Sequence, residues 1–246
     1  MSESTRPDSR APFPTTRWSL VARAGASPSP DARAALESLC RAYWFPIYAF
    51  IRRQGADPEA ARDLAQSYFT RLIEKGTLAA ADPSKGRFRS FLRTDCGFFL
   101  ADERDREHAQ KRGGGCTVFP LEALDAEDRY LREPADELTP ERLFDRAWSL
   151  TLLDRVLGQI SAEYAQSGRA ALFEHLQVVL TGGPSVSYAT LADQLDTTER
   201  AVQTAVWRLR RRYRTILREQ ITATLDDPTD VNVDDEIRAL FAALAR

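Results

Sequence analysis

The sequence predicts an all-α protein. Apolar residues recur at steps of three and four along several long segments, which is the spacing of one buried helix face. Proline and glycine stand where these segments begin and end, and no convincing alternating strand of four or more residues occurs. Apolar side chains make up 43% of the 246 residues, which is enough for a buried core. We expect two helical domains joined by an acidic flexible linker.

Local composition and the positions of proline and glycine divide the chain into five expected regions. Residues 1–30 form a polar, proline-rich flexible arm, and residues 31–112 form the first helical domain. Residues 113–139 open on three glycines and contain seven acids and two arginines, which predicts the acidic linker. Residues 140–220 form the second helical domain, and residues 221–246 are an acidic C-terminal extension with a short helix.

The first domain contains three expected helices. The first carries an apolar stripe from Leu36 to Ile51 and ends at Gln54-Gly55. Asp57 followed by Pro58 is a cap-then-proline start for the second helix, which ends at Gly76. The third begins near Arg87, and its inward residues are Phe88, Phe91, Leu92, Cys96 and Phe99.

The third helix changes character after Leu100. Its apolar stripe stops there, while helix-forming residues continue to Arg112. We therefore expect this end to project from the core and to contact another molecule. The alternative is a solvated helix end, because acids lie among the cations. Phe98 is a candidate surface for stacking an unpaired base, or else an ordinary core residue.

The second domain begins at Thr139-Pro140, another cap-then-proline start, and its long helix ends at Ser167-Gly168. A shorter helix follows over residues 172–180. It is broken by Gly182-Gly183-Pro184.

Residues 187–213 carry the strongest motif in the chain. Ser187 can cap a short helix in which Ala192 is small enough for a second helix to cross closely. Asp196 lies at the turn, where a left-handed backbone is needed, and Thr198 can cap the next helix. Val202 would pack back on the first helix. These spacings predict a helix-turn-helix, the motif of many DNA-binding proteins.

The second helix of this motif has two faces. The expected buried stripe is Val202, Val206, Leu209, Tyr213 and Ile216. The opposite face carries residues suited to base edges and phosphates: Arg200, Gln203, Thr204, Trp207, Arg208 and Arg211. Residues 198–218 contain seven arginines and one acid in a chain of net charge −2. We expect this face to bind DNA, the alternative being a solvated arginine-rich hairpin.

Several segments, taken in order, resemble one protein family. They are Ala61-Arg62-Asp63-Leu64-Ala65-Gln66-Ser67-Tyr68-Phe69-Thr70-Arg71-Leu72, Gly86-Arg87-Phe88-Arg89-Ser90-Phe91-Leu92 and Ala101-Asp102-Glu103-Arg104-Asp105-Arg106, followed by the helix-turn-helix. Together they resemble the bacterial extracytoplasmic-function sigma factors, over residues 32–112 and 140–218. Thr16–Val21 and Pro140–Asp145 also resemble a large subgroup of that family.

The resemblance implies an RNA polymerase sigma factor that directs transcription initiation. Its first domain would dock on the β′ clamp helices of core RNA polymerase through Asp63, Gln66, Ser67 and Phe69. The third helix would face the −10 promoter element with Phe98, Arg104, Arg106, Gln110, Lys111 and Arg112. The helix-turn-helix would read the −35 element, and its remaining surface would meet the β flap.

The sequence departs from this family at Arg62 and Ser67, where acids are usual. Phosphorylation of Ser67 by a Ser/Thr kinase would restore negative charge to the docking face. The alternative is a polymerase surface that has adjusted. An anti-sigma factor is another possible partner. The acidic C-terminal extension either folds back over the basic helix as an autoinhibitor or packs on the flank of that domain.

The sequence contains few motifs that support an enzyme, a metal-binding protein or a membrane protein. No nucleophile–base motif, P-loop or paired carboxylates occur, so we expect neither an enzyme nor a cofactor. The three cysteines and two histidines are isolated, which predicts no metal site and a reducing cytoplasm. The longest apolar stretch, residues 42–51, is too short for membrane insertion. The main alternative is a stand-alone helix-turn-helix regulator with a helical sensing or dimerisation domain.

Overall fold

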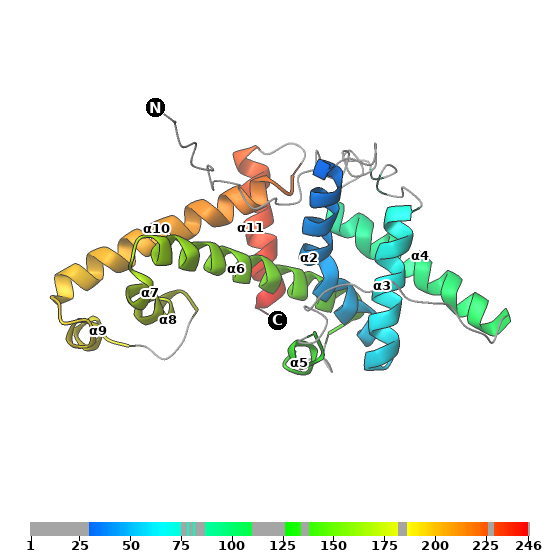
Figure 1. The fold of residues 1–246 in the computed structure, drawn as a ribbon, viewed down its shortest axis with the longest axis horizontal. Coiled ribbons are helices and arrows are strands. Elements are labelled where there is room, and N and C mark those ends of the chain that lie inside the picture. The colour runs from blue at the N-terminus through cyan, green and yellow to red at the C-terminus, as the bar shows by residue number, and fades with distance from the viewer. Residues whose placement is uncertain are drawn as a thin grey trace, which may run out of the picture.

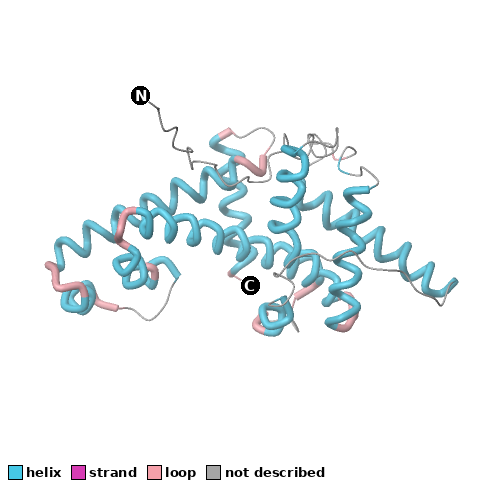
Figure 2. Tube along the Cα trace, in the orientation of Figure 1, coloured by secondary structure: helices cyan, strands magenta, loops and turns pink. Residues whose placement is uncertain are grey.

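The computed structural model describes residues 30–74, 78, 81, 87–109, 126–133, 138–181, 186–225 and 229–245, without the side chains of residues 31–35 and 107–109. Within these ranges the regular structure is helical and contains no strand, so the all-α prediction is confirmed (Figure 2). None of the described helices combines the length and the apolarity needed to cross a membrane. Residues 1–29 of the expected arm lie outside the described residues.

The helices in chain order are α2 (Pro30–Arg53), α3 (Pro58–Glu74), α4 (Phe88–Ala109), α5 (Ala126–Leu131), α6 (Pro140–Gln166), α7 (Ala170–Leu176), α8 (Val178–Thr181), α9 (Tyr188–Gln194), α10 (Glu199–Thr222) and α11 (Asp230–Leu244). In Figure 1, α2, α3 and α4 gather at one end, while α7, α8, α9 and the start of α10 lie at the other. The long helices α6 and α10 run between these ends.

Local capping sets the helix boundaries where the sequence predicts them. The Asp57 carboxylate accepts hydrogen bonds from the backbone amides of Glu59 and Ala60 at the start of α3, at 3.0 and 2.9 Å. The Thr139 side chain accepts from the Arg142 amide at the start of α6. Gly55 adopts a positive φ of 100° after α2, a conformation that glycine takes without steric cost.

One expected helix differs from the structure. Residues 172–180, predicted as a single helix, fall into the two short helices α7 and α8, which meet at Gln177. The Gln177 amide still donates to the Phe173 carbonyl, at 2.8 Å, while the Leu180 amide turns back to the Gln177 carbonyl, at 2.9 Å. The tighter turn at Gln177 therefore interrupts a continuous apolar pattern.

The first half of α6 packs antiparallel against α2. Phe144, near the start of α6, meets Phe50, near the end of α2, with ring centroids 6.3 Å apart. Farther along α6, the Arg155 side chain donates to the backbone carbonyl of Ser38, near the start of α2. The two helices thus join the expected first and second domains through one contact surface.

The second half of α6 supports the helix-turn-helix end. Tyr164 packs on Phe173 of α7, with ring centroids 5.5 Å apart. The Glu163 carboxylate accepts two hydrogen bonds from the Arg212 guanidinium of α10, at 2.8 and 2.5 Å. Buried residues from α2 through α11 consequently form one continuous hydrophobic cluster.

The acidic segment expected to be a flexible linker contains a docked helix, α5. Its Glu127 carboxylate accepts two hydrogen bonds from the Arg52 guanidinium of α2, at 2.9 and 2.8 Å, and a third from the Tyr48 hydroxyl. Arg129 lies over the Phe45 ring, 4.1 Å from its centroid. A helix this short leaves no sustained apolar period, and its attachment depends on charged and aromatic contacts. The linker prediction is therefore wrong for residues 126–131.

The acidic C-terminal extension forms α11, which packs on α6 and α10. The Arg218 guanidinium of α10 pairs with Asp230, at 2.9 Å, and with Asp234. The Arg146 side chain of α6 donates to the Leu244 carbonyl at the end of α11, at 2.8 Å. The extension thus lies on the flank of the second domain, the second of the two expected arrangements. Phe241 of α11 is exposed.

We predict that Glu127→Gln lowers the free energy of unfolding by about 1–2 kcal/mol at pH 7, because Arg52 loses its charged partner. Hydrogen bonds from Arg52 hold the pKa of Glu127 below its ordinary value. Its stabilising effect is therefore present above the unfolded-state pKa of about 4.3 and is lost as pH falls further. Urea unfolding at pH 7 and near pH 3 should show the two proteins converging at acid pH.

The matched control is Glu37→Gln, which removes the exposed Glu37–Arg41 pair on α2. Exposed pairs of this kind contribute about 0.5 kcal/mol or less. Equal losses in the two variants would contradict a special role for Glu127.

Candidate nucleic-acid interface

In the segment predicted as a helix-turn-helix, two capped helices, α9 and α10, are joined by a short turn. The Ser187 hydroxyl accepts from the Thr190 amide at 3.0 Å, and the Thr198 hydroxyl accepts from the Ala201 amide at 3.2 Å, which caps α9 and α10. Between them, Asp196 adopts a left-handed backbone with φ of 48°. Ala192 and Val202 are both buried where the two helices cross.

The outer face of α10 is open to solvent. Every residue of α10 that is expected to contact DNA is exposed, namely Arg200, Gln203, Thr204, Trp207, Arg208 and Arg211. Trp207 is 59% exposed, and the Arg211 guanidinium lies over its ring, 5.5 Å from the centroid. The expected buried stripe is also present, although Tyr213 is only half-buried. No part of α11 covers the recognition residues named here, since they remain exposed.

The arginines of α10 fall into two groups. Arg212 and Arg218 are engaged, because Arg212 binds Glu163 and Arg218 binds the acids of α11. The remaining five make no ion pair with other described residues: Arg200, Arg208, Arg210, Arg211 and Arg214. Guanidinium groups that face water can bind phosphates in pairs of parallel hydrogen bonds. The engaged arginines hold the helix in place, and the others form the cationic surface.

The second expected DNA surface lies on α4, whose C-terminal end extends past α3 in Figure 1. Phe98 is 67% exposed while Phe99 is buried, so the alternative of a core Phe98 is wrong. Arg104 and Arg106 are exposed; Arg104 donates to the Gln54 amide oxygen at 2.9 Å, and Arg106 pairs with Glu103 one turn earlier at 2.6 Å. Gln110, Lys111 and Arg112 lie outside the described residues.

The expected polymerase-binding face on α3 is only partly available. Asp63 and Ser67 are exposed, and Gln66 is half-buried. Phe69, however, is completely buried and stacks on Trp44 of α2, with ring centroids 5.7 Å apart. The assignment of Phe69 to a binding surface is therefore wrong, because the same helical period places it on the core side.

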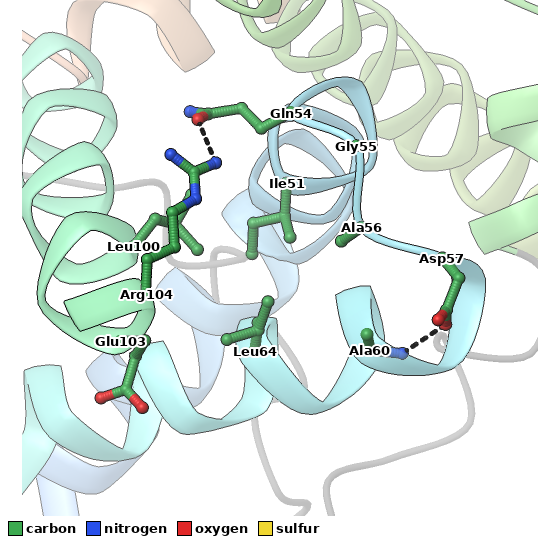
Figure 3. A pocket seen from close by; sticks show the side chains of 10 residues that line it. All are labelled: Ile51, Gln54, Gly55, Ala56, Asp57, Ala60, Leu64, Leu100, Glu103 and Arg104. Carbon is green, nitrogen blue, oxygen red and sulfur yellow. Dashed lines mark hydrogen bonds between the residues drawn. The ribbon is translucent and has the colours of Figure 1, made fainter. Parts of the chain in front are cut away.

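A pocket of about 290 Å³ lies where α2, α3 and α4 meet (Figure 3). Its apolar lining comes from Ile51, Leu64 and Leu100, and the hydrogen bond between Arg104 and Gln54 crosses one side. Pockets for drug-sized ligands begin at roughly this volume. Sequence reasoning missed this pocket because its walls come from three helices that only the fold brings together.

Sequence reasoning also missed a cluster of charges between α4, α6 and α11. Arg87 and Arg89 pair with Glu236, and Arg93 pairs with Asp145. A signal for it existed in the sequence. Glu236 lies between Val233 and Leu240 at helical spacing, and an acid on such a face requires a cationic partner.

No protein-family model, curated protein or solved structure matches this chain significantly.

We predict that Asp196→Gly raises the free energy of unfolding by up to about 1 kcal/mol, whereas Asp196→Ala lowers it by a similar amount. Glycine adopts the left-handed backbone of Asp196 without steric cost, and the short polar side chain of Asp makes it tolerable. Alanine has a Cβ but no polar group, so it carries the full penalty. Urea denaturation measures both changes. Asp193→Ala, which lies in the regular helix α9, should be nearly neutral. An Asp196→Ala protein as stable as wild type would contradict the strained turn.

Proposed function

We propose that this protein is a sigma-type initiation subunit that docks on core RNA polymerase and directs it to promoter DNA. The observation that carries the proposal is the solvent-facing arginine surface on the second helix of the helix-turn-helix. The order of sequence segments that resemble extracytoplasmic-function sigma factors adds the polymerase. The chemistry of RNA synthesis belongs to the polymerase, and this chain contributes binding.

In this proposal α10 enters the major groove at the −35 element. Arg200 and Gln203 lie in its first turns, where they can offer paired hydrogen bonds to guanine and adenine edges. Arg208 and Arg211 lie farther along the helix and suit phosphates, which position the helix without selecting a sequence. The exposed Trp207 ring adds an apolar surface that can lie against a sugar or a thymine methyl group.

The exposed face of α4 would face the −10 element. Its exposed Phe98 ring is suited to stacking on a base that has left the duplex, and Arg104 and Arg106 supply positive charge nearby. Each disrupted base step costs a few kcal/mol, so contacts made only with the unpaired strand would stabilise the open promoter. Asp63 and Ser67 on the outer face of α3 would meet the polymerase clamp.

We predict that Arg208→Gln weakens binding to duplex DNA and makes the slope of log K against log salt shallower by about one. The same substitution at Arg212 should change that slope much less, because the Arg212 guanidinium is held by Glu163. Fluorescence anisotropy with a duplex probe at several salt concentrations compares the two. Equal effects would indicate that only the total charge matters and that α10 presents no distinct face.

A pull-down with bacterial core RNA polymerase, followed by run-off transcription on genomic fragments, tests the function as a whole. We predict stoichiometric binding, new promoter-specific transcripts, and loss of both in Asp63→Lys, which reverses a charge on the exposed face of α3. Glu174→Lys makes the same charge change on α7 and should bind polymerase normally. Salt-sensitive duplex binding without polymerase binding would instead identify a stand-alone regulator.

The same pull-down and transcription experiment can be made with two variants of Ser67. If an unmodified docking face lacks the charge that the polymerase needs, Ser67→Glu should bind polymerase where wild type does not. A Ser67→Ala protein that binds polymerase and activates its promoter in cells as well as wild type would eliminate control by phosphorylation at this residue.

A further inference from the structure

Three arginines at the start of α4 meet two carboxylates that come from α6 and α11. Glu236 of α11 pairs with Arg89 and with Arg87, whose Nε lies 2.8 Å from a Glu236 oxygen. Asp145 of α6 lies 3.0 Å from Arg93 and 3.6 Å from Arg89. The Arg89 guanidinium also lies over the Trp148 ring of α6, 4.4 Å from its centroid. The C-terminal helix thereby reaches the expected first domain.

This cluster is deeply buried at its centre and carries an excess of positive charge. Glu236 is only 1% exposed, and Arg89 is buried beside it. Three guanidinium groups face two carboxylates, which leaves one positive charge without a partner inside the cluster. Burial, reinforced by the neighbouring Arg87, lowers the pKa of Arg89 to about 10. The arginines therefore repel one another, and a ligand with more negative charge would satisfy them better.

Each carboxylate of this cluster forms ion pairs with two of the three arginines. Glu236 pairs with Arg87 and Arg89, and Asp145 pairs with Arg89 and Arg93. Arginine binds carboxylates and phosphates through the same paired geometry. Building on the proposed function, we propose that Arg87, Arg89 and Arg93 form a binding site for the sugar–phosphate backbone of DNA. In this structure the carboxylates of Asp145 and Glu236 pair with the three arginines in place of phosphates.

In this proposal, an anion replaces the ion pairs that Glu236 of α11 forms with Arg87 and Arg89. Among the described residues of α11, Val233, Glu236 and Leu240 are fully buried, while Ile237 and Leu244 pack partly buried against the core. Polar contacts from Arg218 and Arg146 also hold this helix. Arg87 and Arg93 keep part of their side chains open to solvent, which lets an incoming phosphate reach the cluster before α11 leaves.

The test is Glu236→Gln in the full chain, with fluorescence anisotropy on a duplex and on a single-stranded oligonucleotide of arbitrary sequence. We expect tighter binding to both probes, by about threefold or more at low salt. We also expect a slope of log K against log salt that is steeper by roughly one to two, because freed arginines contact phosphates. Arg93→Gln added to Glu236→Gln should remove part of this gain.

Asp235→Asn is the matched control, since it removes one negative charge from the same helix, where Asp235 pairs with Arg238 of α11 itself. An equal gain in both variants would overturn the site, because total charge would then explain the result. No gain in Glu236→Gln, with circular dichroism unchanged from wild type, would also overturn it.

A second variant covers the case in which Glu236→Gln unfolds. Asp145→Asn frees Arg93 without altering α11 and should steepen the slope by about one. Failure of this site alone leaves wild-type duplex binding and its dependence on Arg208 intact. Failure of the proposed function instead removes duplex binding from wild type and from every variant alike.

Discussion

The antiparallel packing of α2 on α6 is the contact on which the rest of the structure depends. The first half of α6 completes the core of the α2–α4 end through Phe144 and its neighbours, and the second half supports α7 and α10. A single helix of 27 residues therefore belongs to both ends of the molecule. Because protein cores are close-packed, the two ends cannot rotate against each other while this contact persists.

Charge is distributed so that the acidic segments neutralise inward arginines and leave outward ones available. Glu127 of α5 holds Arg52, and the acids of α11 hold Arg87, Arg89 and Arg218. The outer arginines of α10 keep their charge for a ligand. A chain of net charge −2 can therefore present a strongly cationic surface at one end, which the overall composition conceals.

The proposed DNA surfaces on α10 and α4 lie toward opposite ends of this packed unit (Figure 1). Contacts with −35 and −10 elements would then be made from a fixed frame, unless polymerase or DNA separates α2 and α11 from their partners. The ion cluster around Glu236 is the place where such a separation would begin, because its polar contacts can be exchanged for phosphates while the apolar contacts of α2 on α6 cannot.

Sequence alone determined the long helices, several of their caps and the turn between α9 and α10, because these follow from local rules. A capping hydroxyl, a left-handed turn at Asp196 and a period of three to four residues each involve neighbours along the chain. Tertiary structure decided that α5 docks on α2. It also decided that Glu236 reaches α4. Each of these outcomes depends on a partner from a distant segment, and side-chain type and spacing do not specify which distant segment will supply it.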